Sequence, residues 1–399
     1  MKKINIKEID KWKISTLILL FVIAVGFLGW FVRNQLKPDF EVTNEQGGNI
    51  FPSVILSTAA TGATYIEPQQ PYLGRPLSCI ALKIKSTSAH SHVLIDVGET
   101  LFFKESISDF VLEKANTEYL IFPDIIWNYD VLRNNIQAQP VSVSVKATLN
   151  NKELSPQVKT FSMRSVNECP LGYRDEQMRY HGTSVFFGAY VNEDNPMIDQ
   201  LLREALDARL VRRFVGYQRT DKQVEDQVYA LWYVLQKRNF KYSSISNSSF
   251  SSNMVYAQRV RTIEDALKAS QINCVDGSVL FASMLKAINL IPVLVRVPGH
   301  MFVGYYLDKD RKKIDFLETT MIGDVNLDDF FPEEKLDSTV AGKTQKEVSL
   351  LTFEKSREYA RKNYEKYALD LNKRKNSDAG YMFLVIDNAL RRNIQPIGK

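Results

Sequence analysis

An uncharged apolar run near the N-terminus, residues 14–32 (ISTLILLFVIAVGFLGWFV), places the strongest constraint on how this chain can fold. A helix of this length spans roughly the ~30 Å hydrocarbon core of a bilayer. Five lysines precede the run, whereas only Arg33 and Lys37 follow it closely. Because the more positive flank stays in the cytosol, we expect a single-pass membrane protein. Residues 1–13 would be a cytoplasmic tail, residues 14–32 a transmembrane helix, and the bulk of the chain periplasmic or extracellular.

A cleaved signal peptide is the alternative interpretation of the same run. The run is long for a signal peptide, however, and no A-x-A-like cleavage site follows it. We therefore expect an uncleaved anchor that contacts the lipid bilayer.

Three cysteines, Cys79, Cys169 and Cys274, lie in the part of the chain expected to be exported. An oxidising compartment would permit a Cys79–Cys169 disulfide and leave Cys274 as the odd thiol. The alternative is that Cys79 is a small buried residue and that Cys169 lies in a loop. In both cases Cys274 calls for a functional explanation.

The pattern of apolar residues divides the exported part into segments. Glycines and prolines in residues 33–70 predict a linker. In residues 71–165 short runs alternate apolar and polar side chains, which predicts an antiparallel β-sandwich of immunoglobulin-like type. Helical periodicity begins near residue 190, and helices followed by antiparallel strands predict an α+β domain over residues 180–340. Residues 346–399 are expected to form a C-terminal helical tail.

Cys274 stands at the predicted start of a buried helix, in the segment NCVDGSVLFASMLKAINLIP. Asn273 is a favourable N-cap residue, and Asp276 stands three residues later, where a capping box has its acid. A thiol in the first turn lies at the positive end of the helix dipole, which favours the thiolate. The backbone N–H of Cys274 is also available to an oxyanion, with Gln258 and Gln271 as weaker candidate donors. The alternative is that Cys274 is an inert buried cysteine.

The segment after this helix brings a histidine near an acid. We expect strands over residues 293–297, 301–307 and 314–317, and a turn centred between residues 309 and 310. This pairing places His300 opposite Glu318 within one residue of register, with Cβ atoms about 5 Å apart. Such a glutamate would fix the imidazole tautomer and leave the other ring nitrogen for a thiol. Asp315 is the rival acid, but strand alternation places it on the other face.

These motifs resemble those of the transglutaminase-like superfamily, whose domain shares the papain-type core. The shared pattern is a cysteine that opens a helix with an acid two residues on, a Gly-His that begins a strand, and an acid followed by Thr at the end of the next strand. Here these motifs are Cys274-Val-Asp, Gly299-His300 and Glu318-Thr-Thr. Residues 185–323 also resemble a bacterial membrane-anchored branch of the superfamily, in which an immunoglobulin-like domain precedes the core.

The resemblance implies Cys274 as nucleophile, His300 as base and acid, and Glu318 as the orienting group. It implies acyl transfer from an amide to water or to an amine, with a peptide or protein substrate in the cell envelope. The sequence departs from the family at Glu318, where aspartate is usual, and at Ile272, where glycine is usual.

The expected protein is thus a cysteine hydrolase or acyltransferase, and the alternative is an inert binding or assembly module on the same fold. We expect no metal and no organic cofactor. The net charge of +5 is scattered along the chain, so we expect no nucleic-acid partner.

Overall fold

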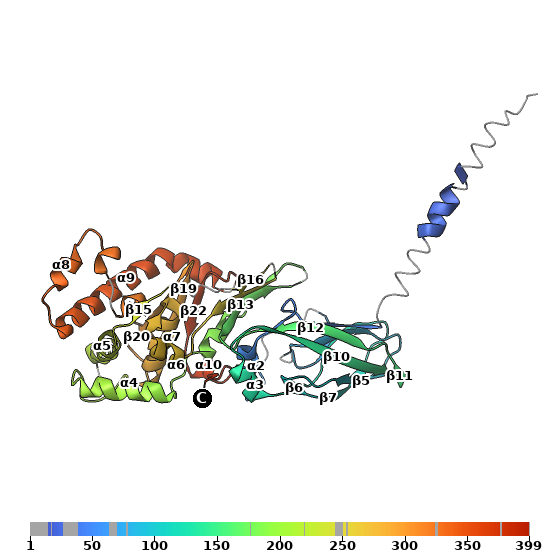
Figure 1. Cartoon of the computed structure of the whole chain (residues 1–399), viewed down its shortest axis with the longest axis horizontal. Coiled ribbons are helices and arrows are strands. Elements are labelled where there is room, and N and C mark those ends of the chain that lie inside the picture. The colour runs from blue at the N-terminus through green and yellow to red at the C-terminus, as the bar shows by residue number, and fades with distance from the viewer. Residues whose placement is uncertain are drawn as a thin grey trace, which may run out of the picture.

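The computed structural model describes residues 15–16, 18–26, 39–63, 70–76, 79–175, 177–218, 220–243, 250–252, 254–323, 326–375 and 377–398. It is a mixed α/β protein in which a β-sandwich adjoins a larger unit of helices and sheets (Figure 1). Among the described residues, no helix is both long and apolar enough to cross a membrane. Within the predicted span, residues 14, 17 and 27–32 lie outside the described residues.

Two sheets packed around one core form the sandwich. The first has the order β1 (Phe40–Thr43), β4 (Ala81–Lys85), β8 (Glu118–Phe122) and β3 (Tyr72–Gly74). The second has the order β2 (Asn49–Ile50), β12 (Gln157–Met163), β10 (Gln139–Leu149), β5 (Ser91–Val97) and β7 (Ser106–Leu112). The predicted alternation is clear in β10, where Val141, Val143 and Val145 are buried and the serines between them are exposed. Most strand pairs are antiparallel, but β3–β8 and β2–β12 are parallel.

The expectation of a linker over residues 33–70 is wrong for residues 40–58. β1 pairs with β4, β2 pairs with β12, and every residue of α2 (Pro52–Thr58) is buried. The glycines at 47 and 48 form the turn between β1 and β2 with positive φ angles, and Pro52 starts a helix rather than interrupting one. Ile55 lies in the sandwich core, whereas Val54 lies in the core of the larger unit, so α2 joins the two cores.

The larger unit is built around a four-stranded antiparallel sheet with a helix on each face. Its order is β21 (Ile314–Leu317), β20 (His300–Tyr306), β19 (Pro292–Val297) and β22 (Met382–Val385). Leu294, Met301 and Val303 share a core with the buried residues of α7 (Cys274–Ala287). Val295 and Phe302, on the opposite face, pack against residues of α9 (Gln345–Arg374). Further helices of this unit include α4 (Pro196–Asp207), α5 (Asp221–Lys237), α6 (Ile263–Ala269), α8 (Leu336–Val340) and α10 (Asn388–Arg391). Two smaller sheets contain β13 (Glu168–Arg174), β14 (Tyr180–Gly182), β16 (Phe250–Ser251) and β17 (Val255–Arg259) in one, and β15 (Lys241–Tyr242) and β18 (Gln271–Ile272) in the other.

The C-terminal segment is more than a helical tail. It contains the predicted helix as α9, but β22 adds an edge strand to the central sheet beside β19. The chain then runs to the junction of the two units (Figure 1), where the Ile397 N–H donates to the Ala189 carbonyl. The expectation of a C-terminal helical tail over residues 346–399 is therefore wrong for residues 382–385, because β22 completes the sheet.

The cysteine environments differ in burial. Cys79 lies in the sandwich core and Cys169 in the core of the larger unit, so these two thiols do not pair with each other. Burial raises the pKa of the Cys79 thiol to about 12 and that of Cys169 well above its ordinary value. Cys274 is partly exposed, so it is the accessible thiol.

Candidate active site

Helix α7 begins with a complete capping box that fixes the position of Cys274. The Asn273 side-chain oxygen accepts hydrogen bonds from the N–H groups of Val275 (2.9 Å) and Asp276 (2.8 Å). The Asp276 carboxylate in turn accepts from the Asn273 N–H at 3.4 Å. The predicted cap is therefore present, and it leaves Cys274 as the first residue of the helix, at the positive end of its dipole.

A second contact holds the same turn from outside the helix. The buried Asp276 carboxylate accepts from the Arg261 N–H at 2.9 Å and forms an ion pair with the Arg261 guanidinium at 3.5 Å. Arg261 thus supports the first turn of α7 through Asp276.

His300 and Glu318 meet at the end of the β20–β21 hairpin. His300 Nε2 lies 2.6 Å from Glu318 Oε2. A carboxylate only accepts, so a neutral ring donates from Nε2 and leaves Nδ1 for another partner. Cys274 lies near enough to the ring to act on its pKa together with Glu318. The structure therefore brings the three predicted site residues together.

Glu318 is fully buried and fixed by further contacts. Its second carboxylate oxygen, Oε1, accepts from the N–H and the hydroxyl of Thr320 at 3.1 and 2.7 Å. Its backbone N–H donates to the Ser356 hydroxyl of α9 at 2.9 Å. These bonds hold the carboxylate toward His300 before any substrate binds.

The rival acid, Asp315, points to a different cluster. It lies directly opposite Tyr305 and accepts hydrogen bonds from the Tyr305 hydroxyl and from Arg357 and Arg361 of α9. It forms a buried ion-pair network that ties the sheet to α9.

The imidazole is held in its charged form. Burial disfavours the imidazolium, but the hydrogen bonds with Cys274 and Glu318 and their negative charges outweigh it and raise the pKa of His300 to about 10. His300 is therefore an imidazolium near neutral pH.

Tyr242 is a site residue that sequence reasoning missed. It lies in β15, which pairs in parallel with β18 so that Tyr242 is opposite Ile272, two residues before the cysteine. Burial, together with the negative charges of Cys274 and Glu318, raises the pKa of its phenol, so the hydroxyl stays protonated and can donate. Neither the pairing of such short strands nor this proximity is signalled by a sequence motif. Gln271 and Gln258, the predicted candidates, lie in β18 and β17, and the Gln258 amide donates to a neighbouring backbone carbonyl.

A cleft of about 300 Å³ opens beside His300. Aromatic and polar side chains from β15, from the turn before His300 and from α9 line it, among them Tyr242, Pro298, Tyr359, Asn363 and Tyr367. The imidazole is therefore accessible to a ligand even though its acid is fully buried.

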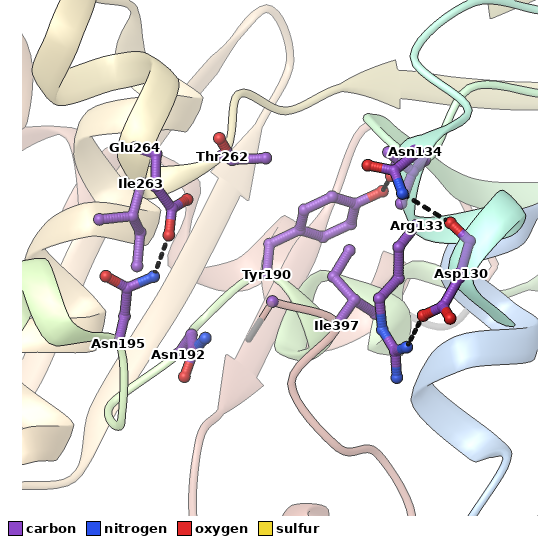
Figure 2. Close-up of a pocket in the computed structure, with 12 residues that line it drawn as sticks. Asp130, Arg133, Asn134, Tyr190, Asn192, Asn195, Thr262, Ile263, Glu264 and Ile397 are labelled. Carbon is purple, nitrogen blue, oxygen red and sulfur yellow. Dashed lines mark hydrogen bonds and ion pairs between the residues drawn. The ribbon is translucent and has the colours of Figure 1, made fainter.

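A second hollow, of about 270 Å³, lies between the sandwich and the larger unit (Figure 2). Its polar side chains already have partners: Asn195 binds Glu264, Arg133 binds Asp130, and the Tyr190 hydroxyl donates to a backbone carbonyl. We assign no chemistry to it.

No protein-family model, curated protein or solved structure matches this chain. Within the part of the chain that the structure describes, no group of three or more His, Cys, Asp or Glu side chains is arranged to hold a metal ion.

Proposed function

We propose that this protein is a transglutaminase-like cysteine hydrolase or acyltransferase with a papain-type core, which acts on amide bonds through Cys274, His300 and Glu318. The observation that carries the proposal is the 2.6 Å contact between His300 and buried Glu318, with the partly exposed Cys274 close enough to act on the pKa of the same ring. Such a nucleophile, base and orienting acid can carry out covalent catalysis.

The proposed reaction has two steps. The Cys274 thiolate attacks the amide carbonyl, a C–S bond forms, and the carbonyl electron pair moves onto oxygen. Collapse of this intermediate breaks the C–N bond, and the imidazolium of His300 gives its proton to the leaving amine. Water or a second amine then attacks the thioester while His300 takes up a proton, which restores the thiolate and releases the product.

Two donors are placed to stabilise the negative oxygen. The Cys274 N–H lies in the first helical turn, and no bond to another described residue occupies it. We assign the Tyr242 hydroxyl as the second donor, since Tyr242 lines the cleft beside His300 and its phenol stays protonated. Removal of one such donor costs about 10²–10³-fold in rate in well-studied hydrolases, so Tyr242→Phe should slow the reaction without abolishing it.

Hydrolysis of an activated ester, p-nitrophenyl acetate, tests the proposed chemistry without knowledge of the natural substrate. The wild-type protein should release nitrophenol in a burst, and mass spectrometry should find the acetyl group on Cys274. Cys274→Ala should abolish both signals, whereas the matched control Cys169→Ala should retain them. Acetylation of no cysteine, or hydrolysis unchanged in Cys274→Ala, would favour the inert-module alternative.

We also propose that residues 14–32 anchor the protein in a membrane with the bulk of the chain outside the cytosol, on the basis of the apolar run and its lysine-rich flank. A reporter enzyme that is active only outside the cytosol, fused after Lys399, should be active in cells. Activity of a cytosol-specific reporter at the same position would overturn this orientation.

A further inference from the structure

Arg296 is a cation beside the site that lacks an acidic partner among the described residues. It lies in β19, directly opposite Met301 of β20 and Met382 of β22. The next residue, Val297, is the cross-strand partner of His300. Both methionines belong to the core under α7, so strand alternation directs Arg296 to the face of the sheet that carries α7 and Cys274.

The guanidinium of Arg296 is incompletely satisfied. Its Nη1 atom is buried and has no hydrogen-bond partner, and no described carboxylate forms an ion pair with the side chain. Four groups interact with it electrostatically, the thiols of Cys169 and Cys274, the phenol of Tyr180 and the carboxylate of Asp378, but none of them forms a hydrogen bond or a close ion pair with the guanidinium. Tyr180 donates to a backbone carbonyl instead, and Asp378 accepts from the Gly380 N–H. By contrast, Arg357 and Arg361 of α9 both form ion pairs with Asp315.

A largely buried cation without an ion-pair partner costs free energy. A bound ligand that accepts hydrogen bonds from such a group would account for its position. Arg296 and Cys274 lie on the same side of the sheet, next to the strand pair that ends at His300, and they interact electrostatically. A planar fork of N–H donors is suited to a carboxylate.

We propose that Arg296 binds a carboxylate of the substrate beside Cys274. The inference rests on the proposed function and names its substrate class: amides that carry a free carboxylate next to the scissile bond. Arg296 is then a specificity-determining residue, and it takes no part in proton transfer.

Alkylation of Cys274 by two small reagents of nearly equal size tests this inference. Iodoacetate carries the carboxylate and iodoacetamide is its neutral counterpart; in both cases the thiolate displaces iodide and a C–S bond forms. Each rate is divided by the rate of the same reagent with glutathione. For the wild-type protein the normalised iodoacetate rate should exceed the iodoacetamide rate by at least about tenfold, the size expected of one charge-assisted hydrogen bond. High salt should reduce this preference.

Arg296→Gln should remove the preference, because alkylation by iodoacetate becomes slower while the rate with iodoacetamide stays nearly unchanged. Arg296→Lys should retain part of the preference. The matched control is Arg311→Gln, which removes a half-exposed arginine paired with Asp387 at the other end of the hairpin. If Arg296→Gln fails to fold, Arg296→Lys decides the question, because it keeps the charge and loses the planar pair of donors. A preference unchanged in Arg296→Lys would assign it to the imidazolium of His300 and overturn the inference.

Equal normalised rates in the wild-type protein, or equal slowing of both reagents in Arg296→Gln, would overturn the inference and leave the proposed function standing. Absence of a Cys274 reaction even with iodoacetamide would instead overturn the proposed function.

Discussion

At the scale of single residues, the structure gives a reason for glutamate at position 318. The observed β20–β21 register pairs Tyr305 with Asp315, so continued pairing would place Glu318 opposite Phe302. His300 is therefore a diagonal neighbour, and such positions have Cβ atoms about 7–8 Å apart in a sheet. The longer side chain of glutamate spans this diagonal. The shorter side chain of aspartate would suit a directly opposed pair.

The protonation of His300 provides a prediction at the same scale. NMR titration of the ring should give a midpoint near pH 10 in the wild-type protein. Glu318→Gln removes the carboxylate that favours the imidazolium and should lower the midpoint by more than about one unit. Because the pKa in the folded state is raised above the ordinary 6.5, the stability gained from this charge is complete below about pH 6.5 and is lost as the pH rises toward 10.

A midpoint for His300 near the ordinary value of 6.5 would contradict the charged ring.

At the scale of elements, sequence pattern located the helix and strands that carry the site. The capping residues Asn273 and Asp276 predicted the start of α7 because a capping box is a local signal. The hairpin was predicted with the correct strands but with its register one residue off. Local turn residues mark where a hairpin turns and do not fix which residues pair. The pairing of β15 with β18 was not predicted, because each is only two residues long and the two are distant in sequence.

The cap of α7 supports a second prediction. Asn273→Ala should lower the free energy of unfolding by about 1 kcal/mol and should also slow Cys274 alkylation, since the thiol's turn loses its anchor. Thr344→Ala removes a similar capping box from α9, with Thr344 bonded to Glu347 on the surface, and serves as the control. Denaturant unfolding and iodoacetamide rates measure the two effects. Equal slowing of alkylation in both variants would show that the cap of α7 has no special role in the site.

At the scale of the whole molecule, the least predictable features are the long-range ones. The segment before the sandwich reads as a linker because it is rich in glycine and proline, yet it supplies β1, β2 and α2. The segment after α9 supplies β22, whose four residues pair with a strand about ninety positions earlier. The strands in both segments pair with strands that are distant in sequence and come close only in the folded chain.

Truncation tests the structural role of residues 40–58. A protein that lacks residues 1–38 should fold, because the first strand of the sandwich begins at Phe40. A protein that lacks residues 1–58 also loses Ile50, Phe51, Val54 and Ile55 from the two cores. Their burial contributes about 6–12 kcal/mol, which is comparable with the whole stability of a domain at about 5–15 kcal/mol. Circular dichroism and thermal unfolding distinguish the outcomes; equal cooperative unfolding of both proteins would contradict the role assigned to α2.

The reactivity of the three cysteines toward iodoacetamide at neutral pH tests the central claim most directly. Site-resolved mass spectrometry should find Cys274 labelled much faster than the buried Cys79 and Cys169. His300→Ala should lower the labelling rate of Cys274 and leave the rates of the other two cysteines unchanged, because an imidazolium stabilises a neighbouring thiolate. Slow and equal labelling of all three thiols, or a Cys274 rate that is indifferent to His300→Ala, would contradict the account.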